Sequence, residues 1–183
     1  MDGEGGNPLL EEEKRRVIEE ALELYGEEVK RLIYTYVKDF DVVDDLFQEV
    51  FVKVYFHLDS FRGESELKTW IYRIAINRSK DYLRSFKYRV LQLLQPVQSE
   101  DVESKVLLKE RNDEVASYVF QLPIKYREII ILYYYRDLSV DEVATVLHIS
   151  ANTVKTRLVR GRERLRKMLE EGGTVDERTF RQG

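Results

Sequence analysis

The segment from residue 151 to residue 168 carries a dense row of positive charge. It reads ANTVKTRLVRGRERLRKM, with seven lysines and arginines against one glutamate, a net charge of +6. Lysine and arginine side chains bind nucleic-acid phosphates and displace their counterions. The same segment places apolar or small residues at the spacing of one buried helical face, namely Val154, Leu158, Gly161, Leu165 and Met168. A cationic helix with one buried face is typical of a DNA-binding element.

The residues before this helix predict a helix-turn-helix. Ser139 and Glu142 have the spacing of a capping box, so a first helix begins there; its expected buried residues are Val143, Ala144 and Leu147. The turn is residues 148–150, and Ser150 caps the second helix. Such a helix presents its first turns to base edges in the major groove. The base-facing candidates are Asn152, Lys155, Thr156, Val159 and Arg160, and the phosphate-facing candidates are Arg157, Arg162, Arg164 and Arg166.

A solvated amphipathic helix is the alternative interpretation of residues 151–168. Charge runs are commonly solvated faces, but here nearly all the charge has one sign. Two helix-start signals also flank a turn of the right length. We therefore favour DNA binding.

A second row of cations lies in the first half of the chain, on a helix expected from about Glu66 to Tyr88. Its polar face is formed by Arg73, Asn77, Lys80, Arg84 and Lys87, and its inward face by Leu67, Ile71, Ile74, Ala75 and Tyr82. A cationic row that includes an amide fits a groove for a single strand with an extruded base. Trp70 and Tyr72 either stack on bases or pack in the core. On the residues alone, strand binding and a solvated face stay open.

The stretch DVVDDLFQEVFVKVYFHL, residues 41–58, predicts an amphipathic helix between these features. One broad face is apolar: Val43, Leu46, Phe47, Val50, Val54 and Leu58. The polar stripe outside it is formed by Asp45, Gln48, Glu49 and Lys53, with Phe51 at its edge. Such a stripe suits docking onto the helices of another protein. A solvated face beside a core phenylalanine is the alternative.

Composition narrows the class of protein. The chain has 183 residues, 43% hydrophobic and 35% charged, and no cysteine, which excludes disulfides and thiolate chemistry. No apolar run has the length of a membrane span, and the start lacks a secretory signal, so we expect a cytoplasmic protein. The net charge of −4 is unevenly spread: residues 1–60 carry −9, residues 61–89 carry +5 and residues 109–171 carry +2. This asymmetry indicates two basic surfaces beside an acidic N-terminal part.

The predicted fold is all-α, because no alternating strand pattern persists. Two small helical domains, residues 21–89 and 109–171, follow an N-terminal extension of residues 1–20; a flexible linker, residues 90–108, joins them, and the tail is residues 172–183. Fully extended, the linker reaches about 65 Å, close to two turns of B-DNA at roughly 34 Å each. Within the first part, residues 9–38 are expected to be helical with a candidate break at Gly26, and Asp41 or Asp44 starts the next helix, which ends near His57. Pro123 starts a helix in the second domain.

Three stretches together resemble the bacterial RNA polymerase sigma factors of the extracytoplasmic-function (ECF) group. They are DDLFQEVF, residues 44–51, SFRGESELKTWIYRIAINRSKDYLR, residues 60–84, and the stretch from LPIKYREIIIL to RERLRK, residues 122–167. The resemblance covers about residues 22–89 and 110–170. Its most specific segment is FRGES followed by TWIYRIA and Asn77.

The resemblance implies a role for each stretch. Docking on core RNA polymerase falls to Asp45, Gln48, Glu49 and Phe51. Recognition and opening of the −10 element on a single strand fall to Phe61, Arg62, Gly63, Ser65 and Asn77, with Arg73, Lys80 and Arg84 along the same helix. Binding of the duplex −35 element falls to Asn152, Lys155, Thr156, Arg157, Val159 and Arg160, with Arg162 and Arg164 at phosphates. An anti-sigma factor, often membrane-bound, is the further partner expected.

Three other classes of protein were weighed. A free-standing helix-turn-helix regulator has no need of the second basic row or of the DDLFQEVF face. An enzyme is disfavoured because His57 and His148 are lone residues and no nucleophile–base set or metal-ligand spacing occurs; no cofactor or metal is expected. A protein-binding adaptor leaves the charge of residues 151–168 unexplained.

Overall fold

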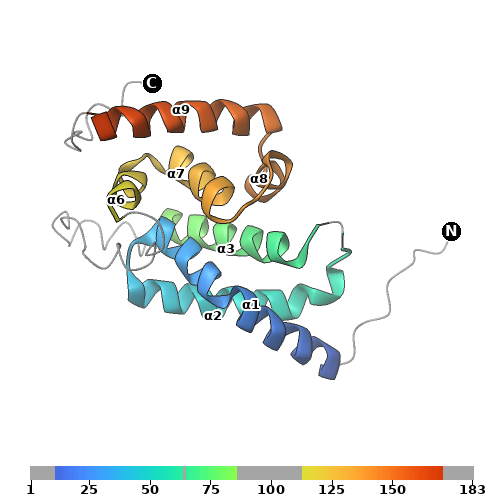
Figure 1. Ribbon diagram of the computed structural model, residues 1–183. Coiled ribbons are helices and arrows are strands. Elements are labelled where there is room, and N and C mark those ends of the chain that lie inside the picture. Colours follow the sequence, from blue (N-terminus) through green and yellow to red (C-terminus); the bar gives the residue numbers. More distant parts are fainter. Residues whose placement is uncertain (1–10, 64, 86–112, 171–183) are drawn as a thin grey trace. The chain divides into compact units, whose positions relative to one another are not determined.

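The computed structural model describes residues 11–63, 65–85 and 113–170 (Figure 1). The described residues form helices and no strand, as the sequence predicts. The chain divides into two compact units, Met1–Leu94 and Gln95–Gly183. The division falls within the expected linker, residues 90–108, which lies outside the described residues together with the expected tail. The domain bounds stay predictions.

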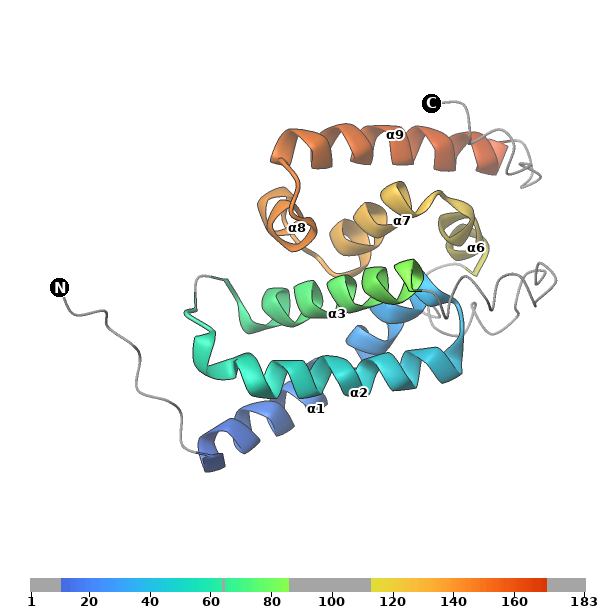
Figure 2. The ribbon, with the colours of Figure 1, turned by 180° about the vertical axis from the view of Figure 1, so that it is seen from behind.

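In residues 11–63 and 65–85, the first unit has three helices and a short 3-10 turn. They are α1 (Glu11–Val37), α2 (Phe40–His57), η1 (Leu58–Ser60) and α3 (Leu67–Arg84). Each helix packs on the other two, and both ribbon views show them side by side (Figures 1 and 2). The core gathers side chains with 0% exposure from all three helices, among them Leu32, Val50 and Ile71. Burial of these aliphatic side chains drives the unit together.

Helix α1 runs without interruption through Gly26, so the break expected there is wrong. A glycine inside a helix costs about 1 kcal/mol relative to alanine, but here the helix packs on both α2 and α3 along its second half. The backbone of Gly26 lies against the ring of Phe47 on α2. Tertiary packing therefore outweighs local propensity.

Two helix ends differ from expectation. Helix α2 begins at Phe40, not at Asp41 or Asp44, because Asp39 is its N-cap and its Oδ1 accepts a hydrogen bond from the backbone N–H of Val42 at 3.2 Å. Lys38, with φ 54°, separates α1 from this cap. Helix α2 ends at His57 as predicted. Helix α3 ends at Arg84, where Ser85 takes an extended conformation, so the expected end near Tyr88 is wrong.

The second unit holds α6 (Asp113–Gln121), α7 (Ile124–Ile130), η2 (Ile131–Tyr135), α8 (Val140–Leu147) and α9 (Ala151–Glu170). Pro123 precedes α7 as its N-cap, as the sequence predicts. The segment η2 is a π-helical turn, and beyond it the N–H of Leu138 donates to the carbonyl of Leu132 at 3.1 Å. Helix α9 packs on α6, α7 and α8. One side of α9 is thus used for the core.

Candidate functional site

Two hydrogen-bonded caps set the helix-turn-helix geometry of α8 and α9. At the start of α8, the hydroxyl of Ser139 accepts from the N–H of Glu142 at 3.3 Å, and the carboxylate of Glu142 accepts from the N–H of Ser139 at 2.8 Å. His148 ends α8 in the left-handed conformation, with φ 54°. Ser150 Oγ then accepts from the N–H of Thr153 at 3.1 Å and caps α9. The predicted capping box and N-cap are confirmed.

The inward faces of both helices agree with the sequence pattern except at two positions, Leu165 and Ala144. On α9, Val154, Leu158, Gly161 and Met168 are buried and Leu165 is half-buried. At Gly161, α9 approaches α7 closely, since an added Cβ would lie 3.3 Å from Cγ1 of Ile130 on α7. On α8, Val143 and Leu147 are buried as expected. The expected burial of Ala144 is wrong: that side chain is half-buried, and Val146 takes the core position.

The residues predicted to read bases share an exposed surface on the first three turns of α9. All five are exposed, namely Asn152, Lys155, Thr156, Val159 and Arg160. Val159 is an apolar side chain with 47% of its surface exposed. The hydroxyl of Thr156 donates to the carbonyl of Asn152 at 2.9 Å. The arrangement offers donors, acceptors and one apolar contact to a ligand.

Two of the arginines predicted to contact phosphates lie against α7 instead of in the exposed row. Arg157 Nη1 lies 3.7 Å from the carboxylate of Glu128, whose side chain is 5% exposed. The guanidinium of Arg164 lies over the ring of Tyr126, 5.1 Å from its centroid. Arg162 is exposed as predicted. The sequence pattern missed this division because the partners on α7 are distant along the chain.

Tyr126 on α7 lies close to several cations, two of them on α9. Burial alone raises the pKa of its phenol, but the charges of Lys125, Arg164 and Arg160, with a hydrogen bond to Arg160, bring that pKa below its ordinary value. A lowered phenol pKa is the expected response to nearby cations. Three cations, Lys125, Arg160 and Arg164, thus lie near the phenol of Tyr126.

The polar face of α3 is present as predicted over the part that is described. Asn77 and Arg84 are exposed, and Arg73 and Lys80 are half-buried. Lys80 Nζ lies 5.8 Å from the ring centroid of Tyr36 on α1. The expected continuation of the row at Lys87 lies outside the described residues. This face therefore carries cations around an exposed amide.

The opposite arc of α3 is wider than the sequence pattern predicted. Leu67 and Ile74 are only half-buried, whereas Ile71, Ala75 and Tyr82 are buried as expected. The other buried residues of the helix are Thr69, Trp70, Tyr72, Ile76 and Ser79. The alternative of base stacking is wrong for Tyr72, because its side chain is 0% exposed and its hydroxyl donates to Glu28 on α1. Packing on two helices at once explains the wide arc.

The loop between η1 and α3 contains four of the predicted residues, and one of them, Phe61, contacts Trp70. The ring of Phe61 is half-buried and lies 5.1 Å from the ring of Trp70, centroid to centroid. Arg62 and Gly63 are exposed, and Ser65 is half-buried. Gly63 has φ 68° and no neighbour within 4 Å of an added Cβ, so glycine serves the backbone conformation there. The loop is attached to α3 at one end and to α2 through η1 at the other.

The predicted docking face of α2 is exposed at three of its four residues. These are Asp45, Gln48 and Glu49, and Glu49 also pairs with Arg78 on α3. Phe51, expected at the edge of the polar stripe, is 7% exposed and packs on Phe47, so it belongs to the core.

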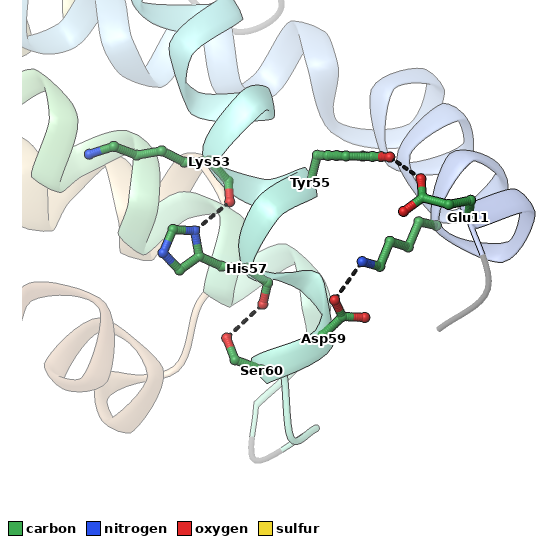
Figure 3. Close-up of polar contacts among 7 residues, drawn as sticks. Glu11, Lys53, Tyr55, His57, Asp59 and Ser60 are labelled. Atoms are coloured by element: carbon green, nitrogen blue, oxygen red, sulfur yellow. Dashed lines mark hydrogen bonds and ion pairs between the residues drawn. The ribbon is translucent and has the colours of Figure 1, made fainter. Parts of the chain in front are cut away.

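Sequence reasoning missed two exposed apolar residues on the same helix. Val52 is 54% exposed and Phe56 is 71% exposed. Both follow Gln48 at intervals of four, so periodicity alone could have found them. Near the end of α2, His57 Nδ1 lies 2.9 Å from the carbonyl oxygen of Lys53, which agrees with a histidine held by its own helix (Figure 3).

Residues 11–63, 65–85 and 113–170 contain neither a candidate metal site nor a candidate membrane span. No group of three or more histidines, aspartates or glutamates there could hold a metal ion. No helix in that part of the chain combines the length and apolar character needed to cross a membrane.

Comparisons with known proteins identify both units. The sigma-70 region 2 family matches residues 21–89, and the sigma-70 region 4 family matches residues 112–165. The ECF RNA polymerase sigma factor SigW of Bacillus subtilis is 32% identical over 163 residues, covering 82% of this chain and 87% of SigW. The ECF RNA polymerase sigma-E factor of Escherichia coli K12 is 36% identical over 152 residues, covering 76% of this chain and 79% of that protein.

Solved structures show the same architecture. The protein CnrH, in complex with the cytosolic domain of CnrY, matches with a TM-score of 0.63 and 25% identity, over 86% of this chain and 90% of that one. The sigma factor RpoE of Bartonella quintana, in complex with the anti-sigma factor NepR, has the same fold, with a TM-score of 0.67 and 22% identity over 85% of this chain and 98% of that one. Two helical regions, the second with a helix-turn-helix, define a transcription initiation factor of the sigma-70 type. The chain belongs to the ECF RNA polymerase sigma factors.

Proposed function

We propose that the two cationic helix faces divide promoter recognition between them. The proposal rests on the positions of α3 and α9. They lie in different units, and each presents cations on the side opposite its buried face. The second unit binds the −35 element as intact duplex, and the first unit binds core polymerase and one strand of the −10 element. Neither unit needs an active site of its own, so the chain acts as a binding subunit, in the cytoplasm.

The exposed start of α9 fits the major groove. Asn152, Lys155 and Arg160 can hydrogen-bond base edges, and the exposed methyl groups of Val159 can contact a thymine methyl. Arg162 and Arg166 contact phosphates. Arg157 and Arg164 hold α9 on α7 through Glu128 and Tyr126, so they set the helix orientation more than they bind DNA.

The polar face of α3 and the loop before it hold the opened strand. Arg73, Lys80 and Arg84 follow the backbone, and exposed Asn77 reads the edge of an extruded base. Extrusion costs a few kcal/mol, which these contacts offset once polymerase holds the chain at the promoter. The effective concentration comes from the second attachment at the −35 element.

The docking surface for polymerase is the exposed side of α2. It combines the polar residues Asp45 and Gln48 with the apolar side chains of Val52 and Phe56. Large exposed apolar side chains beside polar ones mark a protein interface. Phe51 supports this surface from the core.

An anti-sigma factor is the proposed regulator. Support comes from two similar structures, the sigma factor RpoE in complex with the anti-sigma factor NepR and the protein CnrH in complex with the cytosolic domain of CnrY. A partner with a cytosolic domain is consistent with control from a membrane.

The test uses promoters mapped by transcription of genomic DNA with purified core polymerase, with and without this chain. Arg160→Ala should lower transcription that depends on the −35 element by about tenfold, the loss of one good base contact, and leave polymerase binding unchanged. Asn77→Ala should slow opening of a duplex promoter but not of a pre-melted one. Arg16→Ala, an exposed cation on α1, is the matched control. Equal loss of polymerase binding and promoter binding in Arg160→Ala would contradict the division.

A further inference from the structure

The first turn of α1 is bound to the end of α2 and to η1. Lys14 Nζ lies 2.5 Å from Asp59 Oδ2, and the two side chains are 12% and 35% exposed. The hydroxyl of Tyr55 donates to the carboxylate of Glu11, and Figure 3 shows these two side chains pointing at each other across the two helices. Lys14 Nζ also lies 5.9 Å from the ring centroid of Tyr55. Four side chains thus join segments more than 40 residues apart in the chain.

These contacts come from residues that precede the family match. The region 2 match starts at residue 21, whereas Glu11 and Lys14 belong to the first turn of α1. The helix is continuous from there to Val37, and its second half is buried in the core. The first turn is therefore held on a rigid helix.

The 3-10 turn η1, here called the η1 corner, leads directly into the loop that contains Phe61 to Ser65. Asp59 lies in η1, where Leu58 is buried and the N–H of Phe61 donates to the carbonyl of Leu58 at 3.0 Å. Ser60 Oγ donates to the carbonyl of His57 at 2.7 Å (Figure 3). Only Ser60 separates Asp59 from Phe61, whose ring lies on Trp70. Whatever fixes Asp59 also fixes the starting point of the loop.

We propose that Lys14 and Glu11 are positioning residues for the −10 loop, acting through Asp59 and Tyr55. They hold the η1 corner in place before DNA arrives, so that less conformational freedom is lost when the loop takes up the strand. The inference rests on the proposed function of this loop. The hydrogen bond with Asp59 raises the pKa of Lys14, and the one with Glu11 raises the pKa of Tyr55.

The test is a charge swap in the full chain, bound to core polymerase. Lys14→Glu and Asp59→Lys are made singly and together, and promoter opening is followed by permanganate reactivity on a mapped duplex promoter and on its pre-melted form. Each single change should slow opening of the duplex about two- to fivefold, the range that a partly exposed ion pair supports. The double change should restore most of the rate, and the pre-melted template should show no difference. Arg16→Glu, the same charge change on an exposed residue of the same helix, is the control.

Several outcomes would overturn the inference. Single variants that open the duplex at the wild-type rate would do so, as would variants slowed equally on both templates or a double variant without recovery. Polymerase affinity and the thermal unfolding midpoint are measured beside the rate, and a loss of either that matches the loss of rate would assign the pair to folding alone. A wild-type complex that opens no promoter would contradict the proposed function as well. This outcome separates failure of the proposed function from failure of the present inference.

Discussion

Arginines on α9 should divide into those that bind phosphates and those that hold the helix. Arg162 is exposed, whereas Arg157 is 29% exposed by side chain and pairs with Glu128 on α7. Each phosphate contact contributes about −0.9 to the slope of log affinity against log salt concentration. Arg162→Ala should therefore reduce the magnitude of that slope by about 0.9, and Arg157→Ala should change it by less than about 0.3.

The same pair of variants should differ in the opposite sense in stability. Breaking a fully buried ion pair costs about 3–5 kcal/mol. The 29% exposure of Arg157 and the 3.7 Å separation from Glu128 reduce this to about 1–2 kcal/mol for Arg157→Ala. Arg162→Ala should stay within about 0.5 kcal/mol of the wild type. A loss of about 1 kcal/mol in a unit of this size lowers its midpoint by roughly 4–8 °C.

The assay is fluorescence anisotropy of a labelled random-sequence duplex between 50 and 200 mM NaCl, with calorimetry of the same samples. Over that fourfold range, one phosphate contact accounts for about a 3.5-fold change in affinity, which anisotropy measures well. Arg16→Ala is the control for loss of an exposed cation. A slope for Arg157→Ala that falls as far as that for Arg162→Ala would refute the assignment from the structure.

Three further predictions concern the packing that positions the sites. Gly26→Ala should stabilise the first unit by about 0.5–1 kcal/mol, because the new methyl group meets Phe47 at 3.6 Å, an ordinary contact; thermal unfolding measures it. Phe51→Ala should destabilise that unit by about 3–5 kcal/mol, whereas Phe56→Ala should leave stability unchanged and weaken polymerase binding about tenfold, measured by titration with core enzyme. Ser139→Ala should cost the second unit about 1 kcal/mol through loss of the cap, measured by calorimetry.

Each of these has a contrary result. A lower midpoint for Gly26→Ala would mean that Phe47 cannot accept the methyl group. A stable Phe51→Ala variant with weak polymerase binding would return that residue to the docking surface. An unchanged second unit in Ser139→Ala would show that the Glu142 side chain suffices as a cap.

Local signals in the sequence were reliable where a few neighbouring residues determine the structure. The capping box of Ser139 and Glu142 and the N-cap at Ser150 are confirmed, because each involves atoms three residues apart. Four of the five positions in the stripe along α9 are confirmed for a similar reason, since helical periodicity alone sets that face, and the fifth, Leu165, is half-buried. The all-α fold follows from the same patterns.

Features set by distant partners could not be predicted. Periodicity left Phe51 at the edge of the polar stripe, and only its packing on Phe47 and the core decides its burial. In the sequence, Arg157 has the same character as the neighbouring arginines. Its ion pair with Glu128, 29 positions earlier, places it against α7. The contact between Lys14 and Asp59 joins residues 45 positions apart, and no sequence pattern predicts it.

The central claim is that the first unit binds core polymerase while the second binds duplex DNA. The most direct measurement is sedimentation of the chain with purified core RNA polymerase, in the wild type, Phe56→Glu and Arg160→Ala forms. We expect a one-to-one complex for the wild type and Arg160→Ala and its loss in Phe56→Glu. A wild-type chain that binds duplex DNA but forms no complex with core polymerase would contradict it.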